Sequence, residues 1–67
     1  MKQIEENYLL DLYGRSKQNA ISKIQEDDFS WRIVKEDAIS YVMTNDLKVD
    51  RINLIIMNNI VVDASRG

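Results

Sequence analysis

The stretch from Met43 to Asp50 is polar and charged, and it runs directly into an alternating β-branched stretch at residues 51–57. This change of pattern predicts an exposed loop whose far end is held by a strand. Arg51 stands at the junction, from which a guanidinium can reach back under the loop. Small proteins keep binding functions on loops that a scaffold holds rigidly, so the sequence predicts a presented binding loop rather than an active site.

Length and composition limit what this chain can do. A chain of 67 residues allows one domain, so residues 1–67 are expected to form a single unit. It holds no Cys and no His, which excludes disulfides and Cys/His zinc sites and leaves packing within or between chains. The net charge of −2 argues against a DNA or RNA surface, and no apolar run approaches the ~20 residues of a membrane span. We therefore expect neither nucleic acid nor a membrane as a partner.

Two helices are expected before the first strand. Apolar residues at helical spacing predict a helix over residues 3–12, which Gly14 ends. Ser16 is placed to cap a second helix over roughly residues 17–27. We interpret residues 1–11 as a helical extension and residues 12–67 as the core of the domain.

From Trp31 the apolar period changes to that of a strand. Strands are expected at residues 31–35, 39–43, 52–57 and 60–64, with a tight Asn58-Asn59 turn before the last one. The first strand is expected to place Trp31, Ile33 and Lys35 on one side and Arg32 and Val34 on the other. The order of elements predicts an α+β fold, with one helix packed on a small twisted mixed β-sheet, an exposed binding loop and the N-terminal helical extension.

Several short motifs follow one another along the chain at a characteristic spacing. They are Leu12-Tyr13-Gly14-Arg15-Ser16, a helix containing Ala20, Trp31 to Val34, Thr44, Asp50-Arg51-Ile52-Asn53-Leu54 and Gly67. Over residues 12–67 this pattern resembles the potato inhibitor I family, including its prokaryotic, cysteine-poor branch of small peptidase inhibitors. In that family a helix packs on a small sheet, and a convex loop enters a serine-protease cleft as a substrate mimic.

The resemblance implies a role for each loop residue. Thr44 would precede the primary specificity residue, which falls on Asn45, and Asp46 would follow the scissile bond. Arg51 would support the loop from below, its guanidinium holding loop carbonyls or the Asp46 carboxylate. Asn53 stands where plant and leech members have a second Arg. In the prokaryotic branch an Asn is common at this position. Asn45 differs from the large apolar residues that chymotrypsin- and subtilisin-like pockets prefer.

Ile55 and Met57 suggest a second surface. Residues 52, 54 and 56 fill the helix-facing side of their strand, so a period of two places Ile55 and Met57 on the opposite face. Two interpretations remain open: partial cover by Val61 or by the first helix, or an interface between subunits, which would make the chain a homo-oligomer.

Basic and aromatic residues offer a further possibility if chains pair. Tyr41 and the cations Arg32, Lys35, Arg51 and Arg66 from two copies would then form a positive, aromatic-lined pocket, which suits a phosphate-bearing nucleotide. The acidic pairs Asp27-Asp28 and Glu36-Asp37 lack the spacing of a calcium loop, so no metal is expected. With neither His nor Cys, and no Ser in a nucleophile-elbow context, we expect no enzyme and no cofactor.

Three functions follow for such a chain. The first is capture of a small anionic signal, because short, cysteine-free, acidic chains resemble phage-encoded proteins, a class in which small oligomers sequester cyclic nucleotides of bacterial defence. The second is serine-protease inhibition through Thr44-Asn45-Asp46, and the third is an adaptor that docks another protein with the same loop. We expect a cytoplasmic protein, acting in the host-cell cytoplasm if it is phage-encoded.

Overall fold

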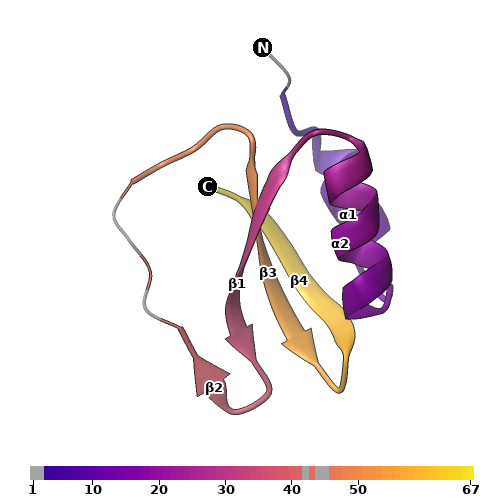
Figure 1. The fold of residues 1–67 in the computed structure, drawn as a ribbon, viewed down its shortest axis with the longest axis vertical. Coiled ribbons are helices and arrows are strands. Elements are labelled where there is room, and N and C mark those ends of the chain that lie inside the picture. The colour runs from indigo at the N-terminus through magenta and orange to yellow at the C-terminus, as the bar shows by residue number, and fades with distance from the viewer. Residues whose placement is uncertain (1–2, 42, 44–45) are drawn as a thin grey trace.

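The computed structural model describes residues 3–41, 43 and 46–67. Its elements, in chain order, are α1 (Glu6–Leu12), α2 (Lys17–Glu26), β1 (Ser30–Glu36), β2 (Ile39–Ser40), β3 (Arg51–Met57) and β4 (Ile60–Arg66). The strands form one sheet in the order β2-β1-β3-β4, in which β1 and β3 are parallel and the other neighbours antiparallel. Both helices lie on one side of this sheet (Figure 1). The predicted α+β fold with a mixed sheet is confirmed.

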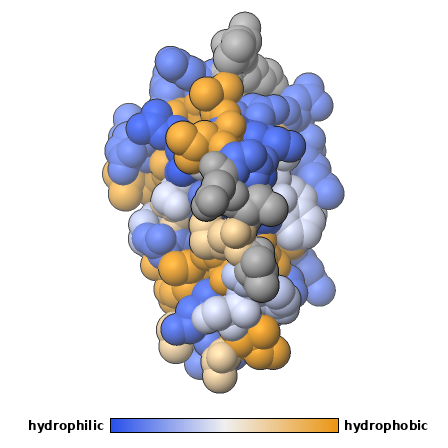
Figure 2. Space-filling model, turned by 90° about the vertical axis from the view of Figure 1, so that its left-hand side faces the viewer, coloured by the Kyte–Doolittle hydropathy of each residue, from blue (hydrophilic) through white to orange (hydrophobic). Residues whose placement is uncertain are grey.

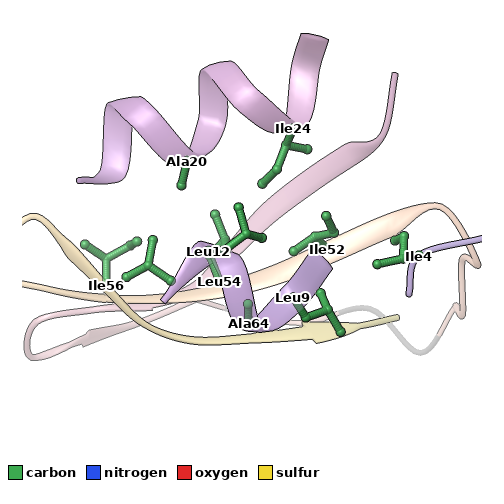
Figure 3. Packing of buried hydrophobic residues seen from close by; sticks show 10 residues of the cluster. Ile4, Leu9, Leu12, Ala20, Ile24, Ile52, Leu54, Ile56 and Ala64 are labelled. Carbon is green, nitrogen blue, oxygen red and sulfur yellow. The ribbon is translucent and has the colours of Figure 1, made fainter. Parts of the chain in front are cut away.

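The core lies between the helices and the middle of the sheet (Figure 3). Ile52, Leu54 and Ile56 alternate along β3 and are fully buried, as the period of two predicts. From the helix side they are covered by Leu9 and Leu12 of α1 and Ala20 and Ile24 of α2, and on the neighbouring strand β4 they are flanked by Val61 and Ala64. Because β3 carries the central row of this core, its opposite face is held rigidly in place. That opposite face, turned away from the helices, is called the outer face below.

The first helix is shorter than the sequence predicts. Its N-terminal boundary is Glu6, and residues 3–5 are not helical, so the expected helix over residues 3–12 is wrong at its beginning. Ile4 is nevertheless buried, with 1% of its surface exposed, because the non-helical segment brings it to the end of the core. The spacing of four between Ile4 and Tyr8 therefore reflects a shared core and not a shared helix.

Residues 14–17 join the helices to the sheet edge. Gly14 has a φ of +84°, which suits glycine, and its N–H donates to the Val61 carbonyl at 2.9 Å. The Val61 N–H donates in return to the carbonyl of Arg15, also at 2.9 Å. Ser16 caps α2 as predicted, since its hydroxyl accepts from the Asn19 N–H at 3.1 Å.

Two expectations about the strands need correction. The register of β1 against β3 shifts between Ile33 and Lys35, and this irregularity places Lys35 opposite Ile55 on the outer face instead of beside Trp31 and Ile33. The strand expected at residues 39–43 is limited to Ile39–Ser40; Tyr41 and Met43 lie beyond it, and Val42 lies outside the described residues. The turn at Asn58-Asn59 is confirmed, because both residues have positive φ, as a tight hairpin requires.

Candidate binding loop and its support

The connection from β2 to β3 spans residues 41–50, and we call it the binding loop. Every described residue of this loop is exposed to solvent; Thr44 and Asn45, the predicted contact and specificity residues, lie outside the described residues. Four exposed side chains are large and apolar: Tyr41, Met43, Leu47 and Val49, of which Leu47 is 89% exposed. Figure 2, turned toward this side of the molecule, shows hydrophobic atoms at the surface in separate areas among hydrophilic ones. A loop that exposes apolar side chains has the composition of a surface for binding another molecule.

Arg51 supports the loop from the sheet, as the sequence predicts. Only 8% of the residue is exposed, and its Nη2 donates to the main-chain carbonyl of Asp46 at 2.9 Å while Nη1 lies 3.3 Å from the Asp46 carboxylate. The same guanidinium donates from Nε to the Gly67 carbonyl at 2.9 Å and from Nη2 at 2.5 Å. In return, the Gly67 N–H donates to the Arg51 carbonyl at 3.1 Å. Arg51 thus connects the loop to β3 and to the residue that follows β4.

A second guanidinium reaches the same carbonyl from the neighbouring strand. Arg32 of β1 stands opposite Asn53 of β3 in the parallel register, and its Nε donates to the Asn53 side-chain oxygen at 2.5 Å. Its Nη2 lies 3.5 Å from the Gly67 carbonyl oxygen. We call Arg32, Arg51, Asn53 and Gly67 the loop brace. Asn53 is 7% exposed, and its side-chain oxygen accepts from Arg32.

The loop brace satisfies the polar groups that it buries. Within the described residues, no buried side-chain nitrogen or oxygen lacks a hydrogen-bond partner. A guanidinium presents five donors in a planar fork, so it can hold a loop carbonyl, a carboxylate and a second carbonyl at once, which an ammonium group does less well. Burial without such partners would be costly, and the fit of donors to acceptors is therefore what allows Arg51 to lie under the loop.

The predicted ligand contacts do not gather at one place within a chain. Arg66 stands opposite the core residue Ile52, and its Nη1 donates to the Ile4 carbonyl at 3.0 Å, which places it on the helix side. Arg32 belongs to the loop brace on the outer face. Lys35 lies on that face too, beside Ile55, while Tyr41 follows β2 and donates its N–H to the Val34 carbonyl at 3.0 Å.

The predicted interface residues lie on the outer face, on the strand that carries the core. Ile55 is half-buried, whereas Met57 is 51% exposed. Two further apolar side chains of β4, Ile60 and Val62, are also exposed. The structure therefore places an apolar surface at this end of the sheet, and a subunit interface there stays a prediction.

A cavity borders the base of the loop. It has a volume of about 270 Å³ and is lined by Gln3, Ile4, Leu47, Lys48, Val49, Arg66 and Gly67. Sequence reasoning did not find it, because its walls come from the N-terminal segment, the loop and the end of β4. Among the described residues no group of three acidic side chains is arranged to hold a metal ion.

Groups with clearly shifted pKa values lie on or beside the helices. Burial, followed by the hydrogen bond to Asp27, raises the pKa of Tyr8, whose hydroxyl lies 2.7 Å from that carboxylate. The hydrogen bond to Asp63 raises the pKa of Tyr13, and the one to Glu36 raises that of Lys17. These contacts connect helices to sheet, so the electrostatics at the helices serve the fold.

Comparison with known proteins does not add to this picture. No protein-family model, curated protein or solved structure matches the chain. Within the described residues, no helix has the length and apolar character needed to cross a membrane.

Proposed function

We propose that this protein is a non-enzymatic inhibitor that presents its binding loop to the cleft of a serine protease, in the way that a substrate would bind. The observation that carries the proposal is the buried Arg51, whose guanidinium holds both the carbonyl and the carboxylate of Asp46. This contact lies beside the Asn45–Asp46 bond, the one that the resemblance assigns as scissile. The exposed apolar side chains of the loop add contact surface for a protease cleft.

The physical basis is preorganisation of the loop. Fixing the backbone of one residue costs about 1–2 kcal/mol, so holding Asp46 in advance saves about that much when the loop binds. A saving of about 1.4 kcal/mol corresponds to roughly tenfold in affinity. The loop brace is the part of this chain that supplies such order, because it connects Asp46 to two strands and to Gly67.

The same contact is expected to slow hydrolysis of the loop by a bound protease. If a protease acylates the carbonyl of Asn45, the new amino group belongs to Asp46, and Arg51 holds Asp46 by its carbonyl and its carboxylate. The amine then stays near the acyl-enzyme instead of diffusing away, so the peptide bond re-forms faster than water replaces the amine. An unbraced loop would be an ordinary substrate.

A panel of chymotrypsin- and subtilisin-like proteases tests this proposal. The expected result is inhibition of at least one enzyme, with Asn45→Leu tightening the inhibition several-fold or more, because these pockets favour large apolar side chains. Gln25→Leu, which adds the same side chain at an exposed position of α2, is the matched control and should leave inhibition unchanged. Absence of inhibition by both the natural chain and Asn45→Leu across the panel would contradict the proposal.

Nucleotide capture by an oligomer remains the second candidate, and one observation favours it. The irregularity in β1 brings Lys35 onto the outer face that also carries Arg32, whereas alternation alone would separate them. Two chains that paired through this face would bring several cations together. A thermal-shift screen with mono-, di- and cyclic dinucleotides tests it: a selective shift that Lys35→Gln or Tyr41→Ala removes supports capture, and a flat screen rejects it. If both screens are negative, the loop is left as the docking surface of an adaptor.

A further inference from the structure

The cavity at the base of the binding loop has the features of a site for a small ligand. Its floor is Ile4, which is 1% exposed, and its apolar walls are Leu47 and Val49, which are 89% and 58% exposed. A ligand that covers Leu47 and Val49 removes exposed apolar surface from water, which lowers the free energy. The floor is fixed by the core, so the cavity does not depend on the loop alone.

Two cations give the cavity its charge. Arg66 is held in place, because its Nη1 donates to the Ile4 carbonyl at 3.0 Å. The Lys48 ammonium makes no hydrogen bond or ion pair with the described part of the chain, and it lines the same cavity. No Asp or Glu side chain lines the cavity, whereas two basic side chains do, although the chain as a whole carries −2. An apolar wall with two cations complements a molecule that has one anionic group and a compact apolar body.

We propose that this cavity binds a small amphipathic anion, its phosphate or carboxylate between Lys48 and Arg66 and its apolar part against Ile4, Leu47 and Val49. The volume of about 270 Å³ sets the size class. Pockets for drug-sized ligands begin at about 300 Å³, so one chain accommodates a nucleoside monophosphate or a short aliphatic carboxylate, and a dinucleotide is too large. The shared chemistry of the two is a single anionic group on a small apolar body.

Gly67 connects this site to the binding loop. It lines the cavity, and its carbonyl is the one that accepts from Arg51. A ligand in the cavity therefore contacts a member of the loop brace and two residues of the loop itself, Leu47 and Val49. Occupancy is expected to hold Leu47 and Val49 in their positions at the cavity. The site stands independently of protease inhibition, since neither Asn45 nor a protease takes part in it.

Titration followed by amide NMR tests the proposal without any protease. Adenosine monophosphate, octanoate and inorganic phosphate are added separately to the full chain. The expected result is saturable shifts of the amides of Leu47, Lys48, Val49 and Gly67 with one of the two amphipathic probes. Shifts with adenosine monophosphate would show that the site takes a phosphate, and shifts with octanoate would show that it takes a carboxylate.

Three substitutions sharpen the result. Arg66→Gln and Lys48→Gln each remove one cation and should weaken binding about tenfold or more, as expected for a hydrogen bond to a charged group. Lys17→Gln, at the beginning of α2 and not among the residues that line the cavity, is the matched control and should leave the affinity unchanged. Equal binding of inorganic phosphate, an equal effect of Lys17→Gln, or no shift with either amphipathic probe would each overturn the proposal. A negative result here would leave the protease experiment unaffected, and the reverse also holds.

Discussion

Replacing Arg51 by Met removes the guanidinium from the loop brace while keeping most of the aliphatic stem. The deleted group makes contacts with the carbonyl and carboxylate of Asp46 and with the Gly67 carbonyl. Asp46 is exposed, so water can replace Arg51 there, whereas the Gly67 carbonyl keeps only the Arg32 contact at 3.5 Å among the hydrogen bonds described. Hydrogen bonds to charged groups contribute about 1.5–3 kcal/mol each, and we count one as lost without replacement. The free energy of unfolding should fall by about 2 kcal/mol.

Arg15→Met is the matched control for this substitution. Arg15 makes three side-chain hydrogen bonds, to the carbonyl and carboxylate of Asp11 and to Asn19, at 2.7 to 2.9 Å, against four for Arg51. Its side chain is 32% exposed, against 10% for Arg51, and such surface pairs contribute about 0–1 kcal/mol. The two arginines therefore differ in burial more than in the number of contacts. Any larger effect at Arg51 measures what burial under the loop adds.

Urea denaturation followed by circular dichroism gives the two free energies, and thermal melts give a second estimate. A loss of about 2 kcal/mol should lower the Tm of a domain this size by roughly 10 °C, compared with less than about 5 °C for Arg15→Met. Hydrogen exchange then reports on the loop: the amides of residues 46–50 should exchange faster in Arg51→Met and not in Arg15→Met. Equal losses of stability in the two variants, with unchanged exchange in the loop, would refute the reasoning.

Three further predictions concern the core, the loop brace and the loss of stability at alkaline pH. Leu54→Ala should cost about 2–5 kcal/mol in urea denaturation, because the side chain is fully buried; a cost below about 1 kcal/mol would contradict the core described here. Gly67→Ala should speed exchange of loop amides, since its Cβ would lie 3.0 Å from Asn53 Nδ2 at a φ of +140°; unchanged exchange would argue against the brace. The pKa of Tyr8 is raised above its ordinary 10.0, so the stability contributed by the protonated hydroxyl is full below pH 10 and falls progressively as the pH rises above it. Tyr8→Phe should therefore reduce the fall in Tm between pH 8 and pH 11. An unchanged fall in Tm would exclude Tyr8 as its source.

Sequence reasoning succeeded where the signal was local. The alternation of β3 identified the three core residues Ile52, Leu54 and Ile56, and Arg51 at the strand's beginning was correctly expected to reach the loop. The turn at Asn58-Asn59 was found because asparagine tolerates positive φ. In each case the pattern lies within a few residues of the feature that it predicts.

It failed where the structure depends on distant pairing. The contact between Arg32 and Asn53 follows from the parallel register of β1 on β3, which no pattern within either strand reveals. The position of Lys35 was wrong because the irregularity after Ile33 carries no turn residue to announce it. Ile4 was assigned to a helix because its spacing fits one, although it packs on the core from a non-helical segment.

A protease inhibitor of the proposed kind holds its loop in a form that a protease binds but does not efficiently cut. Incubation of the natural chain with a subtilisin-like protease, followed by mass spectrometry over time, tests it most directly. Slow cleavage confined to the Asn45–Asp46 bond is expected, with Arg51→Met cleaved much faster and Arg15→Met at the natural rate. Rapid cleavage of the natural chain at several loop bonds, at a rate that Arg51→Met does not change, would contradict it.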